Sequence, residues 1–373
     1  MRRFAQGIDW ILLASITPMI LGGLATMTSF GGGGGLFGKQ LMWIIIGCGV
    51  MFAIASIDMR FFRDSRYITI FYGISISFLV LVLLVGKTVK GSQSWFGFGA
   101  FSFQPTDIVK LMVIAMLAKY FSRRHVAIAQ FKHLAISVVY AALPIGLILL
   151  QPDFGSAMVI TGLWLGLALI AGISKRHILI VVGTGLAVFV IAWVALFKPY
   201  QKDRIVNFIN PTADIRGSGY NAYQSMIAVG SGGVLGKGFG YGTQSRLNFL
   251  PEYETDFMFA AFAEEWGLFG GLIIIAGFCV FLWRIIMHAR RGATNFETLF
   301  CVGYAILMFC HVAVNIGMNI GIMPVTGIPL PFMSYGGSHL LGEFIGLGII
   351  LSMTRFERAS HRDDMRNEFH GYA

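Results

Sequence analysis

One carboxylate, Asp256, has the position expected of a general base. It lies near the end of the stretch Phe249–Phe257, where a long polar segment passes into a strongly apolar one. A carboxylate at such a boundary is partly buried, and it can accept a proton from a substrate that has one end in an apolar medium. The same position also suits helix capping by Thr255 and Asp256, and the sequence leaves that alternative open.

Charged residues also lie inside apolar runs. Asp107 and Lys110 are spaced i,i+3 in the stretch Gln104–Lys110, so a helix places them on one face. Ionisable groups in such runs are costly and are functional candidates by default. We expect an ion pair that locks its helix against a neighbour; the alternative is that Lys110 also meets an anionic substrate. Glu343, in another apolar run, is expected to pair internally.

Polar residues recur in two further apolar regions. Asp153 lies in the turn Gln151–Ser156, where it either caps the next helix or joins a polar site at the outer mouth. His311, Asn315 and Asn319 are spaced by four and form a single stripe on a helix. Such a stripe either hydrogen-bonds to neighbouring helices or lines a hydrated cavity.

The segment Ile227–Gly240 is dense in glycine and contains one lysine, Lys237. Glycine lets backbone N–H groups approach a ligand closely, but the segment lacks the Gly-Lys-Ser/Thr ending of a Walker A phosphate loop. The four cysteines lie in apolar stretches and match no zinc spacing. We therefore expect the cysteines to be small core residues, and we assign no residue as a metal ligand.

The composition shows which medium must position these residues. Of the 373 residues, 56% are hydrophobic and 12% are charged, which is about half the charge of an ordinary soluble protein. This excludes a soluble two-domain enzyme, a secreted disulfide scaffold and a disordered chain. The net charge of +10 is explained by basic cytoplasmic loops, so no nucleic-acid partner is expected.

Ten apolar runs predict an all-α polytopic membrane protein, organised as one integral membrane domain over 1–373. The interval 257–283 would form a helix about 40 Å long, which must tilt in or protrude from a core about 30 Å thick. The predicted spans are 10–28, 40–58, 67–86, 107–121, 133–151, 155–173, 177–197, 257–283, 296–321 and 339–354.

Lysine and arginine set the expected orientation. With the N-terminus inside, 18 of the 28 basic residues fall in cytoplasmic segments, so both termini are predicted to be cytoplasmic. The outer segments 87–106, 198–256 and 322–338 are long or rich in turn residues. The largest, between the seventh and eighth spans, is too long to be a simple linker. The chemistry is therefore expected on the extracytoplasmic face.

Six segments in this order resemble the SEDS family (shape, elongation, division, sporulation) of bacterial cell-wall proteins, and within it the RodA branch. The ten-span count agrees with that family, and the resemblance covers essentially the whole chain. The six segments are Gln104–Lys110, Gln151–Ser156, Gln224–Gly240, Gly242–Ser245, Phe249–Phe257 with Glu264 and Glu265, and Pro324–Ser338.

The resemblance implies a peptidoglycan glycosyltransferase of the bacterial cytoplasmic (inner) membrane that polymerises lipid II for cell elongation and rod shape. It implies a class B penicillin-binding protein as partner, besides the surrounding membrane lipids. Asp256 matches the family's catalytic carboxylate. The family usually has glutamate where this chain has Asp107, whose shorter side chain is still expected to reach Lys110.

Forming a β-1,4 bond from an α-linked donor inverts the anomeric carbon, so one base that activates a sugar hydroxyl suffices. We assign that role to Asp256. Charge builds up on the departing pyrophosphate, and cations stabilise it; the candidates are Lys110, Lys237 and Arg246. Asp153 and Glu252 are further candidates for substrate contact. The cofactor is unknown: a divalent cation such as Mg²⁺ is an option, but no ligand set is readable.

Two other functions stay open. The intramembrane polar residues would also suit a flippase for lipid II, although the sequence has no internal repeat of the kind many transporters show. Alternatively, the chain would be a non-enzymatic scaffold for a penicillin-binding protein, with Asp256 serving only as a helix cap.

Overall fold

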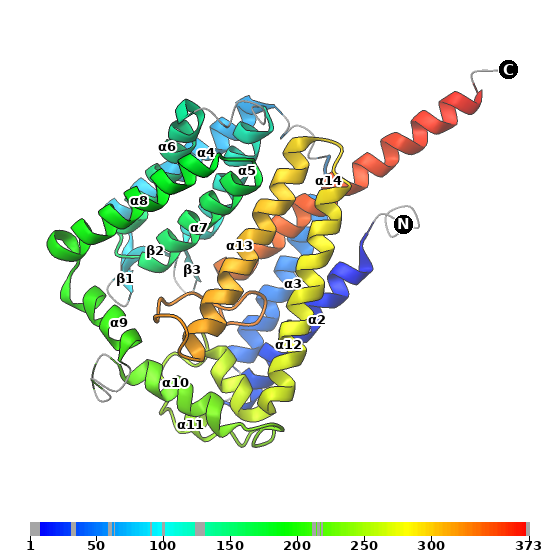
Figure 1. The fold of residues 1–373 in the computed structure, drawn as a ribbon. Coiled ribbons are helices and arrows are strands. Elements are labelled where there is room, and N and C mark those ends of the chain that lie inside the picture. The colour runs from blue at the N-terminus through cyan, green and yellow to red at the C-terminus, as the bar shows by residue number, and fades with distance from the viewer. Residues whose placement is uncertain are drawn as a thin grey trace.

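The computed structural model describes residues 8–30, 35–58, 62, 64–89, 92–98, 101–123, 131–210, 214, 217 and 219–370. It is a bundle of helices (Figure 1). Each of the ten predicted spans coincides with a helix. These helices are α2 (Trp10–Ser29), α3 (Gly35–Ser56), α4 (Ser65–Val85), α5 (Pro105–Ser122), α6 (Phe131–Leu150), α7 (Phe154–Ile170), α8 (Lys175–Ile191), α12 (Met258–Arg290), α13 (Asn295–Asn319) and α14 (Gly337–His370).

Eight of these helices are long and apolar enough to cross a membrane. Helix α7 is equally apolar but has only 17 residues. Helix α5 is the exception in composition, because it carries the three charges of Asp107, Lys110 and Lys119. Both are nevertheless largely buried among the other helices. The chain is thus an all-α polytopic membrane protein.

The earliest helices pack against the latest ones: α2 lies along α12, and α3 along α14. Helix α5 is central, in contact with α4, α6, α7, α13 and α14. Helix α8 lies at the edge of the bundle (Figure 1), continues into the π-helical turn η2 (Ala192–Leu196), and has no buried residue in its 17. One buried apolar core links α2–α7 with α12–α14.

The ends of three helices meet at a buried ionic cluster. Asp9 caps α2 through the N–H groups of Ile11 and Leu12. Its other carboxylate oxygen accepts from Arg284 and lies 2.8 Å from the His288 ring. His288 in turn contacts the hydroxyl of Thr354 at 3.0 Å. The start of α2 and the last turns of the spanning parts of α12 and α14 therefore lie at the same end of the bundle.

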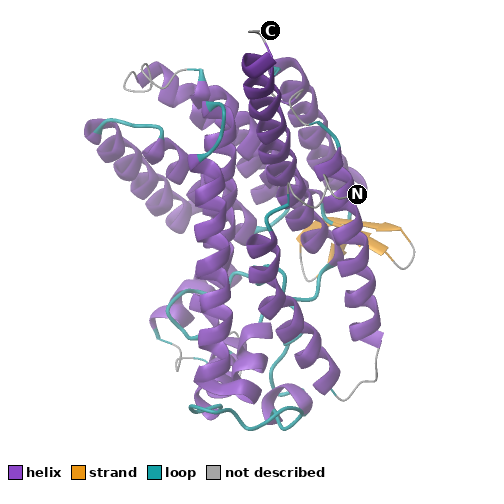
Figure 2. Ribbon diagram, turned by 90° about the vertical axis from the view of Figure 1, so that its right-hand side faces the viewer, coloured by secondary structure: helices purple, strands orange, loops and turns teal. Residues whose placement is uncertain are grey.

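The segment between α4 and α5 adds a small sheet to the helical fold, which was not predicted from the sequence. Strands β1 (Lys87–Val89), β2 (Ser92–Phe98) and β3 (Phe101–Phe103) pair antiparallel in the order β1-β2-β3 (Figure 2). The long segment 198–256 contains three helices: α9 (Pro199–Ile209), α10 (Tyr220–Ser231) and α11 (Thr243–Arg246).

Helix α12 is a hairpin of two helical arms, not one straight rod. The backbone reverses at Gly267, with φ 65° and ψ −166°. The arms then run side by side: a Cβ on Gly271 would lie 3.6 Å from the ring of Phe259, and one on Gly270 would lie 3.1 Å from Phe262. In a straight helix, residues 259 and 271 would be about 18 Å apart.

The expected 40 Å span is therefore wrong. Only the arm 268–290, about 34 Å long, has the length to cross the bilayer. The arm 258–266 turns back beside it, so Asp256 lies about 13 Å along the bundle from the reversal. The reversal at Gly267 was not predicted because residues 257–283 form one long apolar run.

Candidate active site around Asp256

Asp256 is held in place through its backbone. It belongs to the half-buried turn 251–257 that precedes the first arm of α12. Its carbonyl oxygen accepts hydrogen bonds from the side-chain amides of Asn315 (2.9 Å) and Asn319 (3.2 Å). Both asparagines are fully buried on α13. Asn315 and Asn319 of the predicted polar stripe thus bond to another element and position Asp256, whereas His311 lines a small void.

Helix capping does not account for this arrangement. The N-cap of α12 is Phe257, which makes no side-chain cap. The N–H of Ala260 in the first turn donates instead to Asn319 Oδ1, at 3.0 Å. The Thr255 hydroxyl points backward to the Glu252 carboxylate, at 3.1 Å. Glu252 therefore lies in the same turn as Asp256, where it shapes that turn.

The segment 320–336 lies against this turn. Asn315 also donates to the carbonyl of Ile328 (2.8 Å), so one side chain holds both segments. Ser334 Oγ donates to the carbonyl of Thr255 (2.6 Å), and Tyr335 N–H donates to that of Glu254 (2.8 Å).

Gly327 lies opposite the candidate base. A Cβ placed on it would be 3.5 Å from Asp256 Oδ2, and its φ of 75° favours glycine. The carboxylate of Asp256 therefore faces the backbone of this segment.

Two phenols flank the turn. Burial, together with the nearby Glu254 carboxylate, raises the pKa of both Tyr253 and Tyr335 above the usual value of a tyrosine. Both hydroxyls consequently remain protonated at neutral pH, where they can donate hydrogen bonds but not act as bases.

A buried ionic cluster anchors the other end of the segment 320–336. Lys110 lies 3.2 Å from Asp107, as predicted. His339 bridges two carboxylates, with Nδ1 3.2 Å from Asp107 and Nε2 2.9 Å from Glu343. Glu343 also accepts the N–H of Phe332, at 2.9 Å. The internal pairing expected for Glu343 is thus confirmed, and the cluster ties α5 and α14 to the segment that faces Asp256.

This cluster limits what Lys110 can do. Its side chain is 6% exposed and is paired with Asp107. The void beside the cluster is lined by His311, Tyr304 and Leu307, among others, and has room for about one water molecule. In this structure Lys110 is therefore part of the buried cluster, with no space for a substrate phosphate beside it.

Asp153 caps α7 by accepting the N–H of Ser156 at 3.0 Å. Its second oxygen accepts from the side chain of Gln104, at 3.2 Å. Gln104 immediately precedes α5, so Asp153 joins the starts of two helices. The capping alternative is the one that this geometry supports.

The glycine-dense segment braces the hairpin of α12. We call residues 232–238 the glycine brace. The N–H of Lys237 donates to the carbonyl of Glu264 at 3.0 Å, and the N–H of Leu268 donates to that of Gly233 at 2.9 Å. At Gly236, with φ 83°, a Cβ would collide with the backbone of α12. Close approach of two backbones explains this glycine content better than a phosphate cradle does.

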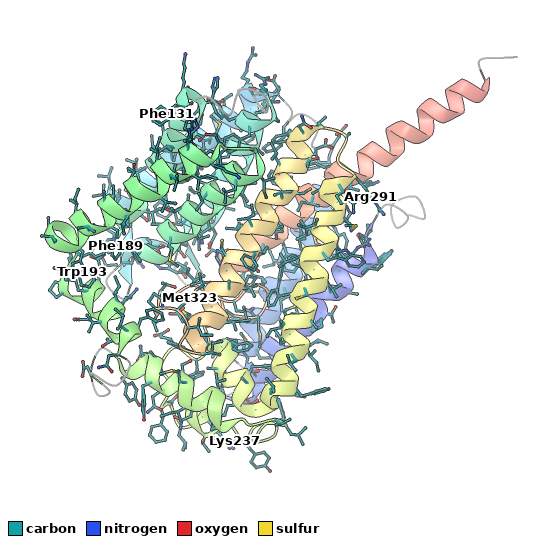
Figure 3. The ribbon with its side chains drawn as sticks, in the orientation of Figure 1. Phe131, Phe189, Trp193, Lys237, Arg291 and Met323 are labelled. Carbon is teal, nitrogen blue, oxygen red and sulfur yellow. The ribbon has the colours of Figure 1, made fainter. Side chains whose placement is uncertain are left out.

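The other two predicted cations already have partners. The Lys237 ammonium lies 2.6 Å from Glu264 and 2.9 Å from the Thr243 hydroxyl. Lys237 projects at the end of the bundle opposite Arg291 (Figure 3). The exposed Arg246 donates to the carbonyl of Gly240 at 3.1 Å. Lys237 thus forms an ion pair with Glu264, whereas the guanidinium of Arg246 bonds to a backbone carbonyl at the surface.

Several contacts around the candidate site were not predicted from the sequence. Ser334 and His339 were not singled out, although both lie in or next to the segment Pro324–Ser338 that carried the resemblance. Glu264 is fully buried and pairs with Lys237 across 27 residues. Only the occurrence of an acidic pair inside an apolar run signalled it.

No metal centre is evident in the described ranges. There, no three histidine, cysteine, aspartate or glutamate side chains come together in a way that could hold a metal ion.

Known proteins resemble this chain over nearly its whole length. The family model for FtsW, RodA and SpoVE, described as "Cell cycle protein", matches residues 8–359. Peptidoglycan glycosyltransferase MrdB of Escherichia coli is 36% identical over 343 residues, which cover 92% of each chain. Stage V sporulation protein E of Bacillus subtilis is 38% identical over 323 residues, which cover 86% of this chain and 87% of that one.

Solved structures share the fold. One solved chain belongs to a structure described as "structural coordination of polymerization and crosslinking by a peptidoglycan synthase complex". It superposes with a TM-score of 0.81 at 30% sequence identity, and the match covers 93% of this chain and 98% of that chain. The rod shape determining protein RodA of Thermus thermophilus matches with a TM-score of 0.70 and 28% identity, covering 93% and 96%. This chain therefore belongs to the FtsW/RodA/SpoVE family, the SEDS family, and within it to the RodA branch.

Proposed function

We propose that this protein is a peptidoglycan glycosyltransferase that polymerises lipid II into glycan strands for cell elongation, with Asp256 as its general base. The names of the relatives support the activity. The observation that supports the role of Asp256 is its attachment: two buried asparagines fix its backbone, and its carboxylate faces the segment 320–336.

In the proposed step, Asp256 accepts the proton of the acceptor sugar's 4-hydroxyl. The hydroxyl oxygen forms a bond to the anomeric carbon of the donor from the side opposite the pyrophosphate. The bond from that carbon to the pyrophosphate oxygen breaks, and the electron pair leaves with the lipid pyrophosphate. The configuration inverts in a single displacement, so one base and one charge-stabilising group are sufficient.

We propose that the site faces the extracytoplasmic side and that both termini are cytoplasmic. The distribution of lysine and arginine supports this orientation. The ionic cluster around Asp9 is consistent with it, because it joins the ends of α2, α12 and α14 on one side of the bundle.

We also propose a class B penicillin-binding protein as partner. The support is the similarity to a chain from a complex described as coordinating polymerisation and crosslinking. A divalent cation such as Mg²⁺ stays part of the proposal only as a counterion of the substrate pyrophosphate. Because no ligand cluster occurs among the described residues, we derive no step through it.

The test is polymerisation of labelled lipid II by the purified protein with its partner, whose transpeptidase is inactivated. Wild type and Asp256→Ala are compared, each checked for folding and partner binding, across several divalent cations. We expect a glycan ladder from wild type and none from Asp256→Ala.

A ladder from well-folded Asp256→Ala would refute the assignment of the base. If folded wild type gave no ladder with any cation, the activity itself would be refuted, and flipping of labelled lipid II in vesicles would then be measured. Complementation of growth by Asp256→Asn would indicate a scaffold.

A further inference from the structure

We infer that a groove between α9 and the segment 320–326 binds an isoprenoid pyrophosphate, the leaving group of the donor, with Arg204 as the cation that contacts the pyrophosphate. This inference rests on the proposed function. It assigns the charge-stabilising role for which Lys110, Lys237 and Arg246 were predicted.

The groove consists of two adjoining narrow hollows of about 20 and 30 Å³. Arg204, Pro324 and Val325 line both hollows, so the two are continuous along one side of α9. Met323, which lines the second hollow, lies nearer the middle of the bundle than Trp193 at the α8–α9 junction (Figure 3).

The walls of the groove suit a hydrocarbon chain. Phe154 and Phe197, whose rings meet edge to face at 5.9 Å, line one hollow. Phe208, Met226 and Met318 line the other. Rigid aromatic and flexible methionine side chains together accommodate a branched, unsaturated chain.

Helix α9 itself is amphipathic. Ile205, Val206 and Ile209 lie on one face, whereas Asp203 and Asn207 lie on another. A helix of this kind lies in the membrane interface. A ligand in the groove would thus have its chain at the level of the lipid and its head at the level of the water.

Arg204 differs from the three cations predicted from the sequence. It is exposed and lines both hollows. Within the described ranges, its side chain makes no ion pair or hydrogen bond. Lys110, Lys237 and Arg246 each have a partner. A guanidinium can donate two parallel hydrogen bonds to a phosphate.

The groove also lies close to the candidate base. Thr326 lines the first hollow, and its neighbour Gly327 faces the Asp256 carboxylate. Adjacent Cα atoms are about 3.8 Å apart. In the displacement, the leaving oxygen and the proton-accepting base lie on opposite sides of one anomeric carbon, so they must be within about one sugar ring of each other. Arg204 lines the hollows beside Pro324 and Val325, and Asp256 faces Gly327, so both residues lie against the same four-residue stretch.

In this arrangement Arg204 acts on the bond that breaks. The electron pair of the carbon–oxygen bond passes to the pyrophosphate oxygen, and the guanidinium compensates the new negative charge. The apolar walls hold the chain, so that the pyrophosphate is placed before the acceptor arrives.

The test measures binding to the full-length protein in phosphatidylcholine nanodiscs, without polymerisation. The probes are farnesyl pyrophosphate, inorganic pyrophosphate, farnesol and phosphatidylglycerol. Wild type is compared with Arg204→Gln, Arg204→Lys and the matched control Lys202→Gln. Lys202 lies on the same helix, over the Trp193 ring at 5.9 Å, and does not line the groove.

We expect farnesyl pyrophosphate to bind at least tenfold more tightly than either inorganic pyrophosphate or farnesol. Arg204→Gln should weaken that binding about tenfold, Arg204→Lys should recover part of it, and Lys202→Gln should change it less than twofold. In the polymerisation assay, Arg204→Gln should lower kcat/KM for lipid II by a similar factor.

Unchanged binding in Arg204→Gln would overturn the inference, as would equal weakening by Lys202→Gln. Competition by phosphatidylglycerol as strong as that by farnesyl pyrophosphate would also overturn it, because the groove would then bind any anionic lipid. Since binding is measured without catalysis, failure of the inference and failure of the proposed activity are distinguishable.

Discussion

Two carboxylates in the same stretch of chain, Asp256 and Glu264, are held in opposite ways. Glu264 is fully buried, and its oxygens accept from the Lys237 ammonium, from the N–H and hydroxyl of Thr243, and from the N–H of Gln244. Asp256 is half-buried, and it is its carbonyl oxygen that the two asparagines of α13 hold.

Under the proposed function, the difference separates a carboxylate that holds the fold together from one that accepts a proton. The contacts of Glu264 join the segment 237–244 to the first arm of α12, which is a structural role. Asp256 is positioned through its main chain, and its carboxylate faces Gly327 of the segment 320–336. This contrast leads to predictions that can be ordered by the size of the expected effect.

The largest effect is expected for Asp256→Asn, which keeps the size of the side chain but removes the base. Loss of a general base typically costs roughly 10²–10⁴-fold in rate. We expect a loss in that range in the lipid II ladder assay, with the midpoint of thermal unfolding unchanged. A clear drop in that midpoint would mean that Asp256, like Glu264, stabilises the fold, and would contradict the distinction between the two carboxylates.

Gly267→Ala should be the most destabilising change in the hairpin that carries Glu264. The backbone at Gly267 has φ 65°, and a Cβ would lie 2.6 Å from the carbonyl oxygen of Val234. Strain and backbone collision together should cost about 3 kcal/mol or more. Thermal unfolding in detergent would measure it. Gly271→Ala is the matched control, because its Cβ would make only an ordinary contact with Phe259; equal losses would argue against the brace.

Glu264→Gln should behave in the reverse way to Asp256→Asn. The change leaves Lys237 without its counterion and places an amide opposite N–H donors, which should cost about 2 kcal/mol. We expect a lower midpoint of thermal unfolding and, in the fraction that remains folded, a turnover close to that of wild type. Asp203→Asn, at an exposed carboxylate, should leave the midpoint unchanged. Loss of turnover in stable protein would show that Glu264 takes part in the chemistry.

The smallest effect is expected for Asn315→Ala, which loosens the backbone of Asp256 but leaves Asn319 in place. Two hydrogen bonds of about 1 kcal/mol each connect Asn315 to the segments around the base. We expect kcat to fall about tenfold and KM for lipid II to stay the same. Asn295→Ala, at the exposed start of the same helix, should change neither. A rise in KM alone would mean that Asn315 binds substrate.

Much of the fold could be predicted because each span is an apolar run bounded by polar or turn residues. The pairing of Asp107 with Lys110 was also readable, since a spacing of three residues on a helix brings side chains together. The bonding of Asn315 and Asn319 followed from the cost of leaving amides unpaired among apolar helices.

The reversal at Gly267 could not be predicted from its own surroundings. Apart from Glu264 and Glu265, residues 258–266 are as apolar as 268–283, so their composition is that of one long helix. What breaks the helix is the glycine brace, about 30 residues earlier in the chain. The same long-range contact brings Lys237 to Glu264, and local sequence contains no information about it.

Because the first helices pack against the last ones, the bundle can assemble fully only after the last helices have been synthesised. Asp9 reaches Arg284 across 275 residues of chain, and α3 packs chiefly on α14. At about 5–20 residues per second, the ribosome needs roughly 15 to 55 s to make that intervening chain. During this interval the first two spans are in the membrane without their final neighbours, and Asp9 has not yet paired with Arg284. Such a protein has a long window in which an insertase or membrane chaperone is of use, and in which premature degradation competes with assembly.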